Sequence, residues 1–199
     1  MKCQHNLAMR RVIYSMMVTL DGYIAGPDGD LNWGAVDEEL HTFVNQKDRQ
    51  VGGHLYGRRT YQVMNDFWAA PAAEDPSQPE FIREYAQIWR AMPKVVFSRT
   101  LESVGDNAVL VRDNAAEAVR ALKQEPGGDL IVGGASLAAS LVALGLVDEY
   151  QLYIHPVMIG RGTRMFPEGD SRLQNAELVD QHTFGSGVVF LHYRNASSA

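Results

Sequence analysis

The sequence predicts a three-layer α/β fold, in which helices cover both faces of a mostly parallel central sheet and an antiparallel C-terminal hairpin forms one edge. Short apolar runs alternate with helical patterns over residues 11–143, which is typical of βαβ units. The first run, residues 11–18, is apolar on both faces, as in a strand buried inside a parallel sheet. The last two runs meet at Gly185-Ser186-Gly187, which indicates a hairpin.

Size and composition favour a single domain. The chain has 199 residues, enough to bury a core without disulfides or a structural metal. Apolar residues make up 46% and charged residues 21%, a balance that argues against disorder. We expect one domain over residues 11–195, an N-terminal extension over 1–10 and a short tail over 196–199.

Several classes of function are disfavoured by charge and residue usage. The net charge of -6 argues against general affinity for nucleic acids. No run approaches the roughly 18 apolar residues of a membrane helix, and the first residues lack the apolar core of a signal peptide. The only cysteine is Cys3, and the six histidines lack metal-ligand spacing, so neither a disulfide framework nor a metal site is expected. We therefore predict a cytoplasmic protein that binds neither nucleic acid nor membrane.

The segment after the first strand is predicted to be a long ordered loop that leads into a helix. Residues 19–34 are rich in Gly, Asp and Pro, and loops of this length usually carry function. Val36, Leu40, Phe43 and Val44 then recur at helical spacing, with acidic residues in the first turn.

The rest of the chain continues the alternation of strands and helices. The predicted elements are a strand that ends at Gly57, a helix that starts at Arg58, a helix marked by Phe81, Tyr85, Ile88 and Trp89, strands over 94–97 and 108–111, a helix over 115–124, a strand over 129–132, a helix from Ala135 and a strand over 149–155. This order places the predicted strand ends along one sheet edge.

Three of these strand ends carry groups suited to an anion. They are Gly57, Arg58, Arg59 and Thr60; Ser98, Arg99 and Thr100; and Gly133, Gly134, Ala135 and Ser136. Glycines let a phosphate approach the backbone, free N–H groups at a helix start attract it, and guanidinium and hydroxyl groups bind it. Each group alone also fits a plain structural role, as a polar strand exit or a tight turn. Their predicted convergence at the carboxyl edge favours a phosphorylated ligand, whereas the standard GxGxxG and Walker motifs are absent.

Four acidic residues are candidates for handling a proton: Asp21 in the long loop, and Asp37, Glu38 and Glu39 at the start of the following helix. The alternative for the last three is helix capping and dipole complementarity. Trp33 either forms the wall of a pocket or fills core. His155-Pro156 and residues 160–164 are interpreted as an exposed turn, with a substrate-phosphate site as the alternative.

Five segments, in this order, resemble the dihydrofolate reductase superfamily: VIYSMMVTLDGYIAG, LYGRRTY, KVVFSRT, LIVGGASL and HPVMIGRGTRMF. The resemblance spans about residues 11–194 and is nearest to the reductase domain of the bifunctional riboflavin-biosynthesis deaminase-reductase and its free-standing relatives. It implies NADPH as cofactor. It also implies that Gly57, Arg58 and Thr60 lie near the pyrophosphate, Ser98 and Arg99 (with Thr100 beside them) at the 2′-phosphate, and Gly133, Gly134, Ala135, Ser136 and Leu137 along the cofactor backbone.

The resemblance further implies a carboxylate early in the helix after the long loop. Counting along the chain places either Glu38 or Glu39 there, with Asp37 adjacent. We take Glu38, Asp37 and Asp21 as catalytic candidates, and Trp33 and Glu39 as substrate-binding candidates. The chain lacks the HxE and Cys-x-x-Cys signature of the deaminase, and GAV replaces the Leu-Pro segment that usually precedes the folate-binding carboxylate.

The function expected from these features is NADPH-dependent transfer of a hydride to a small heterocycle. The reaction type implied by the resemblance is that of 5-amino-6-(5-phosphoribosylamino)uracil reductase in riboflavin biosynthesis. The alternatives are a true dihydrofolate reductase and an NADPH-binding module without turnover. Because relatives of this domain often pair, a homodimer is expected.

Overall fold

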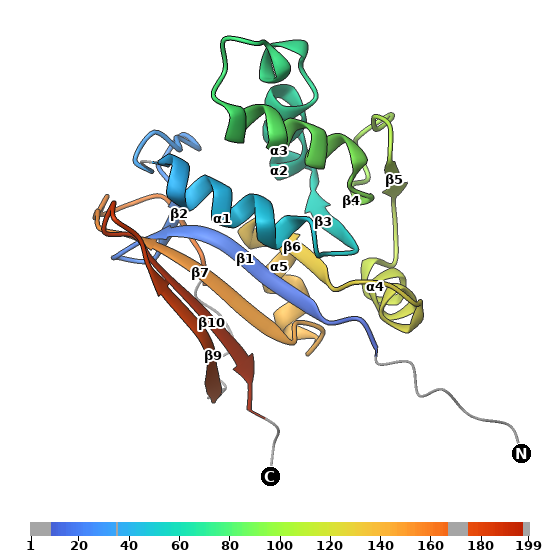
Figure 1. Ribbon diagram of the computed structural model, residues 1–199. Coiled ribbons are helices and arrows are strands. Elements are labelled where there is room, and N and C mark those ends of the chain that lie inside the picture. Colours follow the sequence, from blue (N-terminus) through green and yellow to red (C-terminus); the bar gives the residue numbers. More distant parts are fainter. Residues whose placement is uncertain (1–8, 35, 167–174, 197–199) are drawn as a thin grey trace, which may run out of the picture.

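The computed structural model describes residues 9–34, 36–166 and 175–196. Its strands are β1 (Val12–Thr19), β2 (Tyr23–Ala25), β3 (Gly53–Gly57), β4 (Lys94–Phe97), β5 (Ala108–Val111), β6 (Leu130–Gly133), β7 (Glu149–His155), β8 (Thr163–Arg164), β9 (Ala176–Thr183) and β10 (Val189–Asn195). Eight of them form one sheet in the order β5-β4-β3-β6-β1-β7-β10-β9, while β2 pairs with β8 (Figure 1).

The helices form a layer on each face of this sheet. They are α1 (Glu38–Asp48), α2 (Arg58–Trp68), α3 (Glu80–Ala91), α4 (Ala115–Gln124) and α5 (Ala135–Ala143), with a short 3-10 helix, η1 (Pro71–Glu74), between α2 and α3. The first three helices lie on one face, and α4 and α5 lie on the other (Figure 1). In the part of the chain that the structure describes, no helix has the length and apolar character needed to cross a membrane.

The sheet is mostly parallel, as predicted. Strands β5, β4, β3, β6, β1 and β7 pair in parallel, whereas β10 is antiparallel to both β7 and β9. The predicted C-terminal hairpin at the edge of the sheet is therefore confirmed. Its turn contains Gly187, whose φ of +83° lies in the left-handed region that favours glycine.

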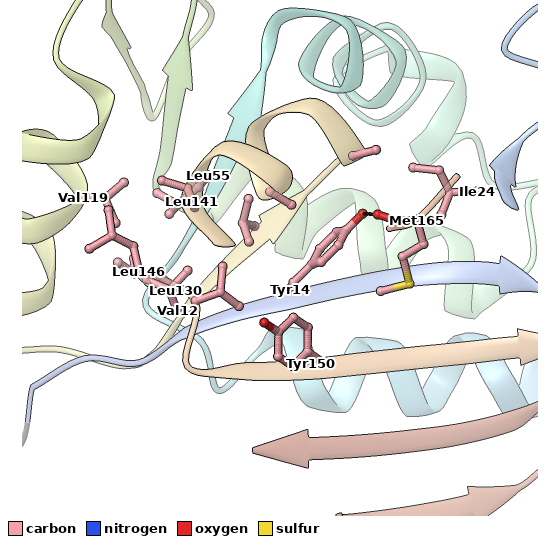
Figure 2. Close-up of a cluster of buried hydrophobic side chains, with 14 of the residues drawn as sticks. Val12, Tyr14, Ile24, Leu55, Val119, Leu130, Leu141, Leu146, Tyr150 and Met165 are labelled. Atoms are coloured by element: carbon pink, nitrogen blue, oxygen red, sulfur yellow. Dashed lines mark hydrogen bonds between the residues drawn. The ribbon is translucent and has the colours of Figure 1, made fainter. Parts of the chain in front are cut away.

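The core is divided by the sheet because successive strand residues point to opposite faces. Leu55 packs with α4 and α5, and its neighbour Tyr56 packs with α2 and α3. Figure 2 shows the first of these clusters around β1, where the Tyr14 hydroxyl donates a 3.0 Å hydrogen bond to the carbonyl oxygen of Met165. This bond ties the residue that follows β8 to the central strand.

Most element bounds agree with the prediction to within one residue. The predicted apolar helix face of Val36, Leu40, Phe43 and Val44 was wrong at its first residue. Val36 is 41% exposed and precedes α1, because the Asp37 carboxylate accepts a 2.9 Å hydrogen bond from Leu40 N and caps the helix, which begins at Glu38. The predicted loop over 19–34 contains β2. Near the start of the described residues, Arg10 is buried and its Nε donates to the carbonyl oxygen of Gly128 at 2.7 Å.

Candidate active site at the carboxyl edge of the sheet

The carboxyl ends of the six parallel strands lie side by side along one sheet edge. Strand pairing places Phe97 opposite Gly57, and Tyr56 opposite Gly133. It also places Thr19 opposite His155 on the two strands that follow in the sheet. The loops that leave these strands therefore share one edge, which is where open α/β sheets bind their ligands.

The β3–α2 and β6–α5 turns touch each other at this edge. Gly134 has a φ of +91°, and a Cβ atom placed on it would lie 2.2 Å from Thr60 Oγ1. A Cβ on the preceding Gly133 would lie 2.9 Å from a ring carbon of Tyr56. Glycine is therefore required at both positions, because any side chain would fill the space where the two turns meet.

The start of α5 continues this contact. Gly134 and Ala135 are buried, Leu137 is half-buried and Ser136 is exposed, and Leu137 Cβ is the nearest atom to a Cβ built on Gly57. Two of the three predicted anion groups are thus in direct contact, with glycine backbone between two helix starts. The N-terminus of α5 carries no side-chain cap, so its backbone N–H groups remain available to a ligand.

The third predicted group lies one strand further out, at the end of β4. Ser98 Oγ accepts hydrogen bonds from the backbone N–H groups of Thr100 (3.2 Å) and Leu101 (3.0 Å), which closes a tight polar turn. Arg99 is 80% exposed, and its Nε donates a 3.0 Å hydrogen bond to Asp113 Oδ1. The adjacent helix start adds the exposed side chains of Arg58 and Arg59.

Asp21 ties two loops of the edge together. Its carboxylate accepts hydrogen bonds from the Thr19 hydroxyl (2.5 Å) and from the backbone N–H groups of Ile159 (3.2 Å) and Gly160 (2.7 Å). These bonds, that from Thr19 first, hold the pKa of Asp21 below its usual value. Asp21 is thus an ionised acceptor that fixes the loop after β1 against the loop after β7.

The three acidic residues at the start of α1 take different positions. Asp37 caps the helix, and Glu38 is exposed. Glu39 Oε2 accepts a 2.8 Å hydrogen bond from Gly185 N in the β9–β10 turn. Glu38 and Glu39 both border an open cavity of about 590 Å³ between α1 and this hairpin, which is also lined by Phe43, His182 and Phe184.

His155, at the end of β7, packs against Trp33 in the loop before α1, and of the two His155 is buried and Trp33 is half-buried. Their rings meet edge to face, with centroids 5.4 Å apart, and Gly34 lies against His155. His155 is 1% exposed, and burial lowers its pKa, which keeps the imidazole neutral at neutral pH. Within the described residues, neither Nε2 of His155 nor Nε1 of Trp33 has a hydrogen-bond partner.

The structure therefore brings the predicted Gly57, Thr60, Gly133, Gly134 and Leu137 together and places Ser98, Arg99 and Thr100 nearby on the same edge. The acidic candidates take separate places, with Asp37, Glu38 and Glu39 at the start of α1 and Asp21 between the loops that follow β1 and β7. Interpreting His155 as part of an exposed turn was wrong, since it is buried. Its position as the last residue of a predicted apolar strand could have indicated this. Across the described ranges no group of three or more His, Cys, Asp or Glu residues has metal-site geometry.

Comparison with known proteins agrees with this architecture. A family model for the RibD C-terminal domain matches residues 10–190. A Bacillus subtilis (strain 168) relative, Uncharacterized protein YyaP, is 38% identical over 192 residues, covering 95% of this chain and 97% of the relative.

Two solved structures show the same fold at lower identity. Acinetobacter baumannii RibD matches with a TM-score of 0.68 and 16% identity, over 95% of this chain and 58% of that chain. A dihydrofolate reductase from Enterococcus faecalis, solved as a complex with NADP(H) and RAB-propyl, matches with a TM-score of 0.61 and 16% identity, over 96% and 98% of the two chains. The fold is therefore dihydrofolate-reductase-like, and the chain belongs to the family of RibD C-terminal domains.

Proposed function

We propose that this protein is an NADPH-dependent reductase that transfers a hydride to a small heterocycle, in a reaction of the 5-amino-6-(5-phosphoribosylamino)uracil reductase type. The observation that carries the proposal is the contact between Thr60 and Gly134. At this contact the backbone of Gly134 and the start of α5, which has no side-chain cap, lie at the carboxyl edge of the sheet. Backbone N–H groups in this arrangement are suited to binding a pyrophosphate.

The residues around this contact fit a phosphorylated nicotinamide nucleotide. Arg58 and Arg59 supply positive charge beside the glycine turn, and Arg99 extends from the next strand end with free guanidinium nitrogens. When bound, NADPH would supply the hydride, so the protein's own residues need only bind, orient and exclude water.

The substrate end of the site is proposed to lie toward β7 and the loop before α1. There, within the described residues, buried His155 and half-buried Trp33 each have a ring nitrogen that is shielded from solvent and lacks a hydrogen-bond partner, which suits the polar edge of a flat heterocycle. Asp21, Asp37 and Glu39 are each engaged in hydrogen bonds to backbone N–H groups. Glu38 has no such bond among the described residues, and it is the carboxylate we assign to holding a proton during turnover.

The test is a titration of NADPH and NADH followed by nicotinamide fluorescence. Wild type should bind NADPH more tightly than NADH, and Arg99→Ala should reduce that preference about tenfold, equivalent to about 1.4 kcal/mol. Arg120→Ala is the matched control, because it removes an exposed arginine from the middle of α4. If wild type binds neither nucleotide, the proposal is wrong.

Turnover assays separate the remaining alternatives. Oxidation of NADPH with the ribosylaminopyrimidine substrate supports the proposed reaction. Oxidation with dihydrofolate instead would identify a dihydrofolate reductase. Tight NADPH binding without oxidation by pyrimidine, pterin or quinonoid acceptors would identify a binding module without turnover.

A further inference from the structure

The carboxylate of Asp113 lies beside the turn formed by Ser98, Arg99 and Thr100 after β4. Asp113 follows β5, which pairs in parallel with β4, and the backbone N–H of Ser98 donates a 3.0 Å hydrogen bond to the carbonyl oxygen of Val111. The loops after both strands therefore leave the sheet side by side. Across this gap Arg99 Nε donates to Asp113 Oδ1 at 3.0 Å.

This contact uses only one edge of the Arg99 guanidinium. A guanidinium has five N–H donors, and those on its two terminal nitrogens are not used by Asp113. Both side chains are open to solvent, at 80% exposed for Arg99 and 67% for Asp113. An anion can therefore bind Arg99 while Asp113 remains beside it.

The charge of Asp113 then acts differently on the two nicotinamide nucleotides. A phosphate held by the terminal nitrogens of Arg99 lies well within the Debye length of about 10 Å at 0.1 M salt, so the carboxylate repels it. A ribose hydroxyl is neutral and can donate a hydrogen bond to the same carboxylate. We propose that Asp113 is a specificity-determining residue that opposes the 2′-phosphate and narrows the preference for NADPH over NADH. This inference rests on the proposed binding of a nicotinamide nucleotide at this edge.

A purely structural role for Asp113 makes a different prediction. The residue precedes Asn114 at the start of α4, where the helix dipole favours a negative charge. If that were its whole role, removing the charge would lower stability slightly and leave nucleotide binding unchanged. Stability and nucleotide preference can therefore be measured separately.

Asp113→Asn is the decisive variant, because asparagine keeps an oxygen that can accept from Arg99 Nε but removes the charge. We expect NADPH to bind about fivefold more tightly in 0.1 M salt, with NADH binding unchanged, and the gain to shrink in 0.5 M salt as screening increases. Asp106→Asn is the control, since it removes an exposed carboxylate before β5, at the opposite end of that strand.

The outcomes are distinguishable. A wild type that binds nucleotide, together with an Asp113→Asn variant whose NADPH-to-NADH preference is unchanged or reduced, overturns the role of Asp113 but leaves the proposed function in place. An equal gain in Asp106→Asn also overturns it, since the effect would then reflect net charge alone. A wild type that binds neither nucleotide overturns the proposed function and this inference with it.

Discussion

Gly134 combines a left-handed backbone with a complete lack of space for a side chain. Its φ is +91°, and an added Cβ would lie 2.2 Å from Thr60 Oγ1. We expect Gly134→Ala to lower the free energy of unfolding by about 3 kcal/mol, from backbone strain and the clash together, and to weaken nucleotide binding. Denaturant unfolding and the nucleotide titration measure the two effects.

Two further variants separate strain from clash. Gly145 also has a positive φ, +65°, but nothing lies within 4 Å of its added Cβ. Gly145→Ala should therefore cost only the backbone term, about 1 kcal/mol. Adding Thr60→Ala to Gly134→Ala should recover part of the loss. Equal costs for the two glycine substitutions would show that Thr60 does not press on Gly134.

Lys94 is a buried amine that costs stability. It is 3% exposed, its Nζ donates to the carbonyl oxygen of Met92 at 2.7 Å, and it lies 4.7 Å from the centroid of the Trp89 ring. Burial lowers its pKa to about 8. Lys94→Met, which keeps an unbranched side chain one atom shorter and removes the amine, should therefore stabilise the protein at pH 7 by about 1–3 kcal/mol.

The stabilisation by Lys94→Met should depend on pH with a definite sign. Below pH 8 the amine is charged in both the folded and unfolded states, so the full cost is present. Between about pH 8 and 10.5 the folded state loses its proton first, so wild-type stability rises and the advantage of the variant shrinks. Urea unfolding at pH 7 and pH 10 tests this, and a destabilised variant at pH 7 would show that the contacts of Lys94 outweigh its burial.

At the residue scale, the sequence predicted groups that are contiguous in the chain better than groups that meet in space. The glycine turns and Ser98-Arg99-Thr100 are visible because a strand pattern precedes each of them. The pairing of Arg99 with Asp113 depends on β4 and β5 being neighbours, and the burial of His155 depends on Trp33, which lies far away in sequence. The Arg99–Asp113 contact leaves no local signal in the sequence, and the only local indication of the burial of His155 is its place at the end of an apolar strand.

At the scale of elements, Glu149 connects three strands at the amino edge of the sheet. Its fully buried carboxylate, at the start of β7, accepts hydrogen bonds from Arg11 (2.8 Å), which directly precedes β1, and from His192 (2.8 Å) and Arg194 (2.7 Å) of β10. Burial alone would raise the pKa of Glu149, but the hydrogen bonds from Arg194 and His192 and the charge of Arg11 outweigh it, so the pKa is lowered.

Glu149→Gln should lower the free energy of unfolding at pH 7 by about 3 kcal/mol, because it leaves the surrounding cations without their shared partner. The folded pKa of Glu149 is depressed, so its contribution is fully present above the unfolded pKa and is lost as the pH falls through the folded value. The gap between variant and wild type should close in acid. Urea unfolding from pH 7 to pH 3 measures it, with exposed Glu102→Gln as control, and a gap independent of pH would contradict this account.

Elements with strong periodicity were predicted well, and short or capped ones less well. The strands over 94–97 and 149–155 have the predicted bounds, because their apolar runs are bounded by polar or turn residues. Strands β2 and β8 have three and two residues and lie inside predicted loops, and their pairing needs contacts distant in sequence. The start of α1 shifted because capping by Asp37 outweighed the apolar stripe that included Val36.

At the scale of the whole molecule, fold class and family followed from the order of the elements together with the motifs at their ends. The predicted homodimer, the boundaries at residues 10 and 195 and the cytoplasmic location stay predictions. Residues 1–8 and 197–199, assigned to the extension and tail, lie outside the described residues. Assembly and location depend on surfaces and cellular context that strand periodicity does not encode.

The central place of β1 has a consequence for how the chain folds as it is synthesised. Among the described strands, β1 comes first along the chain and pairs only with β6 and β7, and Val12 pairs with Leu130, more than half the chain away. Strands β3, β4 and β5 can pair with one another much earlier. We therefore expect a nascent chain that stops before Glu149 to expose one edge of β1, and closure of the sheet around β1 to be a late and slow step of folding.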